Sequence, residues 1–358
     1  MALFGPSHAQ THRNVPGRAI FTYRTPRGNR RRRVARGVLQ EPHEAFRTPQ
    51  DVLAAELSPD TQETCNTYNM LKLTRALFGW KAEPRYADFH ERAFLNHILT
   101  TQHPAKGQVM YFLSLEPGHF KVFDTPNDSF WCRTGTGIES FSKLGDSLYF
   151  HSDDALWVNL FFASEATWKA KGVVVRQETT FPEEEGTTLT IRAAQPAAFT
   201  LHVRVPSWAE GAVVRVNGRT VGGAAASPGY VSLARTWKDG DRVKVSLPMK
   251  LFLDRMPDNP NLAAVRYGPL VLAGELGTAQ FAPEQQFQKD PRAMDGAPRV
   301  PVPEFVGVTA DPSDWIERVP GKPLTFRTRG VGRPADVTLI PLNRLYDQRY
   351  NVYWRLKP

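Results

Sequence analysis

Between residues 58 and 151 the apolar residues recur at every third or fourth position, which is the spacing of helices. Ser58 and Thr61 are candidate N-caps of a first helix, whose apolar face continues to Trp80. Pro84 suits the first turn of a second helix. Two amphipathic helices in succession predict a helical hairpin.

Two further elements are predicted after this hairpin. Val109 to Leu115 is an extended stretch that closes on the turn Glu116-Pro117-Gly118. After Cys132 the apolar positions again have helical spacing, and the helix is entered through Gly135-Thr136-Gly137. Cys132 is therefore expected on a loop that leads into a helix, where reactive groups are common.

From Leu156 onward the apolar period changes to two, which predicts strands. Asn217-Gly218 is a strong hairpin signal, and residues 276 to 334, rich in Pro, Gly and charge, predict long loops. Short strands at this spacing are typical of β-sandwiches. The predicted strands are Leu156–Phe162, Val173–Phe181, Thr187–Ala193, Phe199–Val205, Val213–Val216, Tyr230–Leu233, Val243–Leu247, Leu262–Ala273 and Val337–Leu342.

The composition places the chain among globular proteins. Its 358 residues have room for two or three domains, and 41% of them are hydrophobic. No stretch reaches the apolar length that spans a bilayer, and residues 1 to 10 lack the regions of a signal peptide. We therefore expect no membrane partner and, by default, a cytoplasmic location. Nothing in the sequence indicates an oligomeric state.

The net charge of +9 comes from one segment. Residues 1 to 40 hold nine arginines and no Asp, Glu or Lys; without these nine, the 36 remaining basic residues balance 36 acidic ones. Such a segment is typical of an arm that binds nucleic acid through its phosphates. A solvated, disordered tail can have the same composition, and we expect such a tail rather than a nucleic-acid-binding arm. A third reading is sequence translated out of frame.

Both cysteines of the chain have neighbours suited to chemistry. Glu63 lies two residues before Cys65, and Cys132 precedes a glycine-rich turn. A carboxylate with two thiols is a suitable ligand set for one zinc ion. Two cysteines in a chain of this length are, however, more often buried and inert, and the spacing of common zinc motifs is absent.

Three motifs resemble glycoside hydrolase family 127, the β-L-arabinofuranosidases. They read ETCNTYNMLKL from Glu63, FWCRTGTGIE from Phe130 and DQRYNVYW from Asp347, and the likeness runs from about Glu44 to the C-terminus. The resemblance implies an (α/α)6 barrel followed by β-sandwich domains. The expected fold is therefore multidomain α + β, with partial (α/α)6-barrel helices before antiparallel β-sandwich modules. The expected segments are an atypical, Arg-rich 1–42, a barrel remnant 43–155, a β-sandwich 156–256 and a second β-sandwich with long loops 257–358.

The resemblance also implies chemistry for named residues. Members of the family are retaining enzymes that release terminal β-L-arabinofuranose and whose nucleophile is a zinc-bound cysteine. Carried over to this chain, Glu63, Cys65 and Cys132 hold the zinc and Cys132 is the nucleophile. Glu44 is the acid/base, and Tyr111 and His8 contact the substrate, which is a carbohydrate. Taken without the resemblance, Tyr111 is better explained as a core aromatic residue and Glu44 as a surface acid.

The chain departs from the family in two ways. Most relatives carry a second cysteine where this chain has Arg133, so water could complete the zinc coordination, or Arg133 could hold Cys132 as a thiolate with zinc weakly bound or absent. Only about 155 residues precede the β region, too few for six helical hairpins. We therefore expect an N-terminally truncated member, with residues 13 to about 42 out of frame and activity impaired by the truncation.

Two alternatives belong to other functional classes. The first is a non-catalytic, carbohydrate-binding β-sandwich protein, which would keep its sugar binding after Cys132→Ala. The second is a protein that binds nucleic acid through residues 1 to 40, with an affinity that falls steeply with salt. We expect a carbohydrate, an arabinofuranoside, as the partner of this chain rather than a nucleic acid.

Overall fold

The computed structural model describes residues 52–221 and 228–358. These residues divide into two compact units. The sandwich unit contains residues 145–205 and 211–247, and the helix–sheet unit contains 52–144, 206–210 and 248–358. Each unit is described by itself. The domain boundaries expected from the sequence stay predictions.

The helix–sheet unit begins with the predicted helical hairpin. Helix α1 (Thr64–Trp80) packs against α2 (Pro84–Asn96), and Pro84 occupies the first turn of α2 as expected. The predicted N-caps of α1 are wrong. The Thr61 hydroxyl accepts from the Ser58 amide at 2.6 Å inside a turn that precedes the helix. Between this turn and α1, the chain is extended because it pairs with another segment.

That pairing joins strand β1 (Gln62–Glu63) to β2 (Phe112–Leu113), which confirms part of the extended stretch predicted from the sequence. Helix α3 (Cys132–Ser142) follows and packs against α1. Cys132 is the first residue of α3, so its expected place on a loop is wrong by one turn of helix. Gly137 allows α3 to approach Val109 closely, because a Cβ there would lie 3.2 Å from the Val109 side chain, which would then have to shift.

The second half of the helix–sheet unit is one connected sheet of ten strands. One edge of β14 (Leu262–Tyr267) pairs with β13 (Leu251–Arg255). Its other edge is divided, because the first half pairs with β22 (Tyr353–Lys357) and the second half with β15 (Leu270–Glu275). From β15 the sheet continues to β20, β18 and β17, and from β22 it continues to β16 and β19. The remaining strands are β16 (Glu304–Val306), β17 (Ile316–Arg318), β18 (Phe326–Thr328), β19 (Gly332–Arg333), β20 (Thr338–Pro341) and β21 (Tyr350–Asn351).

Two strand predictions need correction here. Leu262–Ala273 is not one strand but the hairpin β14–β15, which turns at Gly268 with a φ of 53°. Residues 276 to 334 are not only loops, since they contain β16 to β19. The strands expected to form a second sandwich are connected by hydrogen bonds into one sheet, and the second sandwich itself stays a prediction.

A buried asparagine attaches α2 to this sheet. The Asn96 side chain donates to the Pro269 carbonyl at 2.9 Å and accepts from the Val271 amide at 2.7 Å. Beside it, an apolar core joins the segment that follows the hairpin to the sheet, and includes Met110, Leu113, Phe123, Val271, Leu342, Tyr350 and Tyr353. The helices are therefore supported by the sheet rather than by each other alone.

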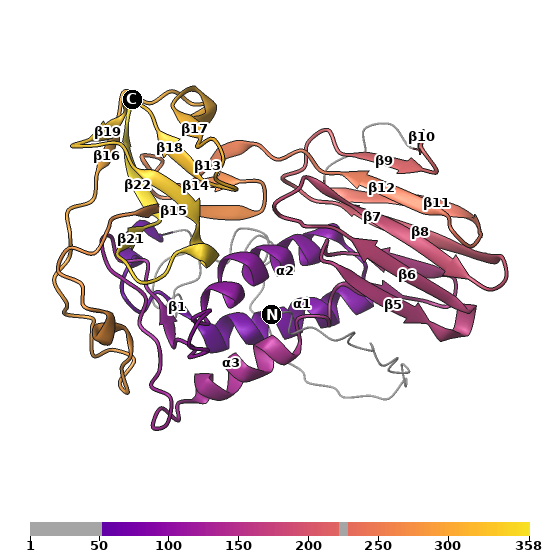
Figure 1. The fold of residues 1–358 in the computed structure, drawn as a ribbon, viewed down its shortest axis with the longest axis horizontal. Helices are drawn as coiled ribbons and strands as arrows, with labels where there is room; N and C mark the ends of the chain where they lie inside the picture. Colours follow the sequence, from indigo (N-terminus) through magenta and orange to yellow (C-terminus); the bar gives the residue numbers. More distant parts are fainter. Residues whose placement is uncertain (1–51, 222–227) are drawn as a thin grey trace. The chain divides into compact units, whose positions relative to one another are not determined.

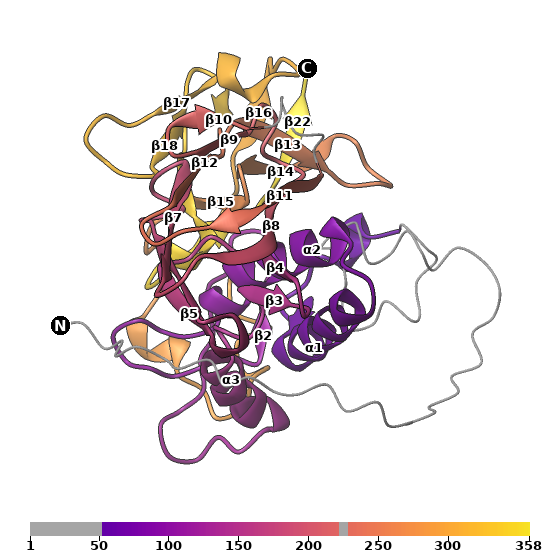
Figure 2. The same ribbon diagram turned by 90° about the vertical axis from the view of Figure 1, so that its right-hand side faces the viewer.

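The sandwich unit has two layers, seen in Figure 1 and Figure 2, whose neighbouring strands are antiparallel except for β4 and β8, which are parallel. Rings from the two layers meet where Trp168 lies 5.3 Å from Phe199, and Trp237 packs against Phe199. One layer has the strand order β10-β9-β12-β7-β6-β5 and the other β11-β8-β4-β3. The strands are β3 (Tyr149–His151), β4 (Ala155–Val158), β5 (Ser164–Trp168), β6 (Val173–Glu178), β7 (Gly186–Ala193), β8 (Ala197–Val205), β9 (Val213–Val216), β10 (Arg219–Thr220), β11 (Gly229–Trp237) and β12 (Arg242–Ser246).

The sandwich unit follows the period of two closely. The predicted hairpin forms at Asn217-Gly218, where both residues have positive φ and Val216 pairs with Arg219. Strand β6 alternates buried and more exposed positions from Val173 to Glu178, as the apolar pattern requires. The sequence therefore predicts this unit better than the other.

The described residues combine helices with β-sheets and do not form a complete helical barrel. Three α-helices, α1 to α3, occur within 52–221 and 228–358. The expected (α/α)6 barrel thus stays a prediction. None of these described helices combines the length and the apolar character needed to cross a membrane.

Candidate metal and nucleophile site

Pairing of β1 with β2 creates one side of the candidate site. Glu63 is aligned with Phe112, and the next residue, Thr64, donates its amide to the Tyr111 carbonyl at 3.2 Å. The buried Thr64 hydroxyl also contacts the Met110 carbonyl at 3.2 Å. These bonds place the start of α1 beside Tyr111.

Three contacts hold the start of α3 in place. The Trp131 indole donates to the Lys289 carbonyl at 2.7 Å. Asp124 accepts from the Arg133 guanidinium and from the Thr134 hydroxyl, both at 2.9 Å. Cys132 lies between these anchored residues.

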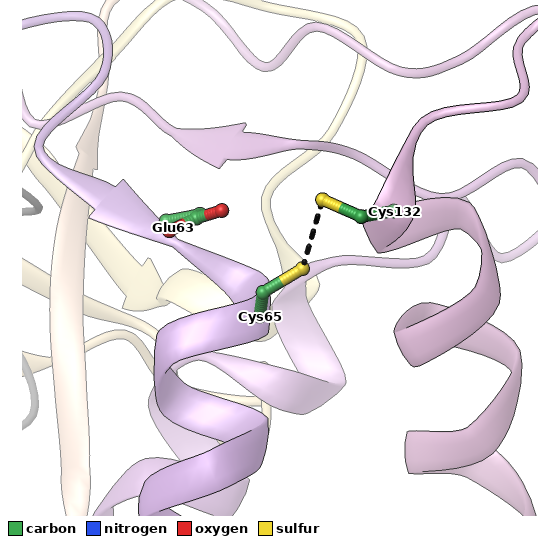
Figure 3. A group of neighbouring side chains, drawn as sticks. All are labelled: Glu63, Cys65 and Cys132. Carbon is green, nitrogen blue, oxygen red and sulfur yellow. Dashed lines mark hydrogen bonds between the residues drawn. The ribbon is translucent and has the colours of Figure 1, made fainter.

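The first turns of α1 and α3 bring the two thiols together. The Sγ atoms of Cys65 and Cys132 are 3.6 Å apart (Figure 3). The Glu63 carboxylate points toward the same space, and the ligand atoms of the three residues lie within 4.8 Å of one another. Cys65 is half-buried, whereas Cys132 is exposed. Among the described residues, this is the group with the composition and spacing of a metal site.

Two hydroxyl groups contact the cluster. The Tyr111 hydroxyl donates to Glu63 Oε1 at 2.9 Å and lies 3.2 Å from Cys132 Sγ. The Thr136 hydroxyl lies 3.2 Å from Cys65 Sγ. Each thiol therefore has a hydroxyl neighbour in addition to the other thiol.

The surroundings favour the protonated form of two groups. The pKa of Cys65 is raised to about 11, first by burial and then by Cys132 and Glu63, against an opposing contact with Thr136. Burial, followed by the contacts with Cys132 and Glu63, also raises the pKa of Tyr111. Without a cation, the half-buried thiol is thus a poor thiolate, and a positive charge in the cluster would reverse this preference.

The donor set fits zinc. A carboxylate oxygen and two thiol sulfurs are ligands that zinc accepts, and three protein ligands leave one coordination position open, as in catalytic zinc sites. The structure thus brings Glu63, Cys65, Cys132 and Tyr111 together, and the roles that the family resemblance implies for them stay predictions. Glu44 and His8 lie outside the described residues, as does the Arg-rich segment.

Sequence reasoning missed two residues of the site. Thr136 was treated as part of a turn, but it contacts Cys65 from inside α3. Asp124 was not considered, although it holds both Arg133 and Thr134. Only the helical position of Thr136, four residues after Cys132, could have suggested its role; nothing in the sequence indicates that of Asp124. His97 is fully buried, and its Nδ1 atom lies 2.7 Å from the Thr67 hydroxyl.

Models of known protein families match three parts of the chain. A model described as the GH127 catalytic domain of β-L-arabinofuranosidase matches residues 29–146, and one described as the GH127 middle domain matches residues 155–249. The chain belongs to glycoside hydrolase family 127. A third model, for a domain of unknown function, matches residues 252–356. The catalytic-domain match begins at residue 29, inside the Arg-rich segment and before the start of likeness expected near Glu44.

Solved structures resemble this GH127 chain in fold. One is a GH127 β-L-arabinofuranosidase from Geobacillus stearothermophilus T6, with a TM-score of 0.65 and 20% identity over 84% of this chain and 51% of its own. A glycoside hydrolase (TM-score 0.64) and a GH127 β-arabinofuranosidase (0.61) also share 20% identity over 84% of this chain, and 53% and 51% of their own. The GH127 chain thus spans about half the length of these structures. None of the curated proteins matches it.

Proposed function

We propose that the protein is a retaining glycosidase that releases terminal β-L-arabinofuranose, with Cys132 as the nucleophile. The observation that carries the proposal is the position of Cys132. Its exposed thiol lies at the first residue of α3, with Cys65 Sγ 3.6 Å away and the Tyr111 hydroxyl 3.2 Å away. Membership of family 127 supports the class of substrate, a carbohydrate.

The residues that would hold zinc are Glu63, Cys65 and Cys132. Zinc, when bound, would supply a positive charge that keeps the thiols deprotonated. Cys132 is the first residue of α3, where the positive end of the helix dipole lies. Tyr111 fixes the orientation of Glu63 through its hydroxyl.

The proposed reaction has two displacements at the anomeric carbon. In the first, Cys132 Sγ forms a bond to that carbon while the glycosidic C–O bond breaks, and Glu44 gives its proton to the departing oxygen. In the second, water attacks the same carbon, Glu44 takes the proton of the water and the C–S bond breaks. Two inversions retain the anomeric configuration. The role of Glu44 rests on the resemblance to the family.

We also propose that α1, α2 and α3 belong to the wall of an (α/α)6 barrel. The proposal rests on the resemblance to the family and is supported by the packing of α1 against both other helices. An experimental structure in which no further helix borders α1 or α3 would contradict it.

Turnover of an aryl β-L-arabinofuranoside tests the catalytic proposal. We expect hydrolysis by the chain, loss of at least about a thousandfold in rate with Cys132→Ala, and about one zinc per chain by elemental analysis. Ser142→Ala is the matched control, because Ser142 is exposed at the other end of α3. Equal turnover by the Cys132→Ala variant and the unmodified chain would refute the nucleophile, and no turnover by either would refute the activity of this chain.

A further inference from the structure

Arg133 is a buried charge directly behind the metal cluster. Its side chain is 0% exposed, and its one ion pair is with Asp124, which is itself buried. The Nε and Nη1 atoms have no hydrogen-bond partner among the described residues. Burial of a guanidinium costs free energy because its charge loses contact with water, and an apolar side chain of similar size would fill the same space without that cost. The charge of Arg133 is therefore expected to act on its neighbours.

One tyrosine ring separates this charge from the cluster. The Arg133 guanidinium carbon lies 5.1 Å from the centroid of the Tyr111 ring, in a cation–π contact. The hydroxyl of the same ring contacts Glu63 and Cys132. Movement of Arg133 would therefore move the ring and the hydroxyl that orients the cluster.

The charged and titratable groups around Arg133 come from several elements. Asp124 precedes α3, Cys65 is on α1, Tyr111 precedes β2, and His97 follows α2. Burial, followed by the charge of the nearby Arg133, lowers the pKa of His97 to about 3, so His97 carries no charge at neutral pH. The positive charge of Arg133 is thus compensated by Asp124, while the ring that Arg133 contacts, Tyr111, carries the hydroxyl that bonds Glu63.

We propose that Arg133 is a positioning residue that holds Tyr111 against the cluster and weakens the binding of a divalent cation to Glu63, Cys65 and Cys132. The fixed positive charge of Arg133 repels a metal ion and so offsets part of the attraction that the carboxylate and the thiolates exert on it. Because water is excluded around Arg133, this effect is only weakly screened. The inference concerns the metal held in the proposed function, yet its test does not depend on turnover.

The affinity of the chain for Zn²⁺, measured by competition with a chromophoric chelator, tests this proposal. Arg133→Gln removes the charge, and we expect binding tighter by roughly tenfold or more. Asp124→Asn leaves the guanidinium without its partner, and we expect binding weaker by a similar factor. Arg133→Lys keeps the charge and should stay within about threefold of the unmodified chain.

The opposite signs separate an electrostatic role from a structural one. Arg133→Gln and Asp124→Asn disrupt the same ion pair, so a purely structural role would weaken metal binding in both, and that result would overturn the proposal. Absence of Zn²⁺ binding in all four proteins would also overturn it. If Arg133→Gln fails to fold, Arg133→Met takes its place, because methionine removes the charge and leaves no buried polar group without a partner; tighter binding in Arg133→Met supports the proposal and weaker binding refutes it.

A spectroscopic measurement accompanies the affinities. The Co²⁺-loaded chain should show the charge-transfer absorption of two thiolate ligands, which Arg133→Gln should leave unchanged, since Arg133 is not a ligand. Loss of this absorption in Arg133→Gln would overturn the assigned role. Failure of the proposed function is distinguishable, because it would appear as absent turnover while the order of the three affinities still held.

Discussion

Replacement of Asn96 by alanine should weaken the attachment of α2 to the sheet. Asn96 is 1% exposed and lies at the last position of α2. Its amide group donates to the Pro269 carbonyl and accepts from the Val271 amide, 2.9 and 2.7 Å away. Alanine fits the helix, and besides the local bond from the Asn96 amide to the Arg92 carbonyl at 3.0 Å it removes both bonds to the sheet.

The magnitude follows from these two bonds. Each lost hydrogen bond costs about 1 kcal/mol, and the buried Val271 N–H that loses its acceptor adds about 1–2 kcal/mol. The free energy of unfolding of the helix–sheet unit should therefore fall by about 3 kcal/mol. Since 1.36 kcal/mol corresponds to a factor of ten, amide exchange limited by this opening should accelerate by about 150-fold.

Hydrogen–deuterium exchange of a peptide that contains Val271 measures this directly, and urea denaturation gives the global value. Asn127→Ala is the matched control, because Asn127 is exposed in a loop and should change stability by less than about 0.5 kcal/mol. A loss below about 1 kcal/mol in Asn96→Ala, with unchanged exchange at Val271, would refute the reasoning. It would mean that the helices are held on the sheet by apolar packing alone.

Three further predictions concern the site and its surroundings. Tyr111→Phe removes the hydroxyl that bonds Glu63 at 2.9 Å, a charged bond of about 1.5–3 kcal/mol, so kcat/KM on an aryl arabinofuranoside should fall about ten- to hundredfold with an unchanged circular dichroism spectrum. Cys65→Ala should reduce the zinc retained after gel filtration from about one per chain toward zero, and full retention would exclude Cys65 as a ligand. Burial, followed by the charge of Arg133, lowers the pKa of His97 from its ordinary 6.5 to about 3 in the folded chain. The free energy of unfolding should therefore not depend on His97 above pH 6.5, and below pH 6.5 it should fall by at most about 1.4 kcal/mol per pH unit, because the unfolded chain takes up a proton there. Urea midpoints that stay constant from pH 6.5 to 4.5 would contradict this.

The local pattern predicted element types better than element limits. The start of α1 was placed at Ser58 or Thr61, six or three residues before Thr64, because cap residues are common in turns too. What decides the limit is the pairing of β1 with β2, a contact between distant segments. The hairpin at Gly268 was missed for a related reason, since β14 and β15 are buried along most of their length and show no alternation.

The candidate site was only partly contained in local sequence. Glu63 and Cys65 are neighbours in the chain, but Cys132 is 67 residues away from Cys65, and its place in the cluster came from resemblance to a family rather than from spacing. The bond between Asp124 and Arg133 had no sequence signal, because a loop acid nine residues before an arginine is common and usually solvated.

By itself, the sequence determined the period of the strands in the sandwich unit, the helical hairpin and the family, because these depend on neighbouring residues and on motifs that stay intact along the chain. Only the tertiary structure decided that Glu63, Cys65 and Cys132 share one space, that Tyr111 bridges two of them and that Arg133 is buried behind that tyrosine. The physical reason is that distances between residues far apart in the chain follow from strand pairing and helix packing, and burial, which changes the energy of a charge most, exists only after those contacts form.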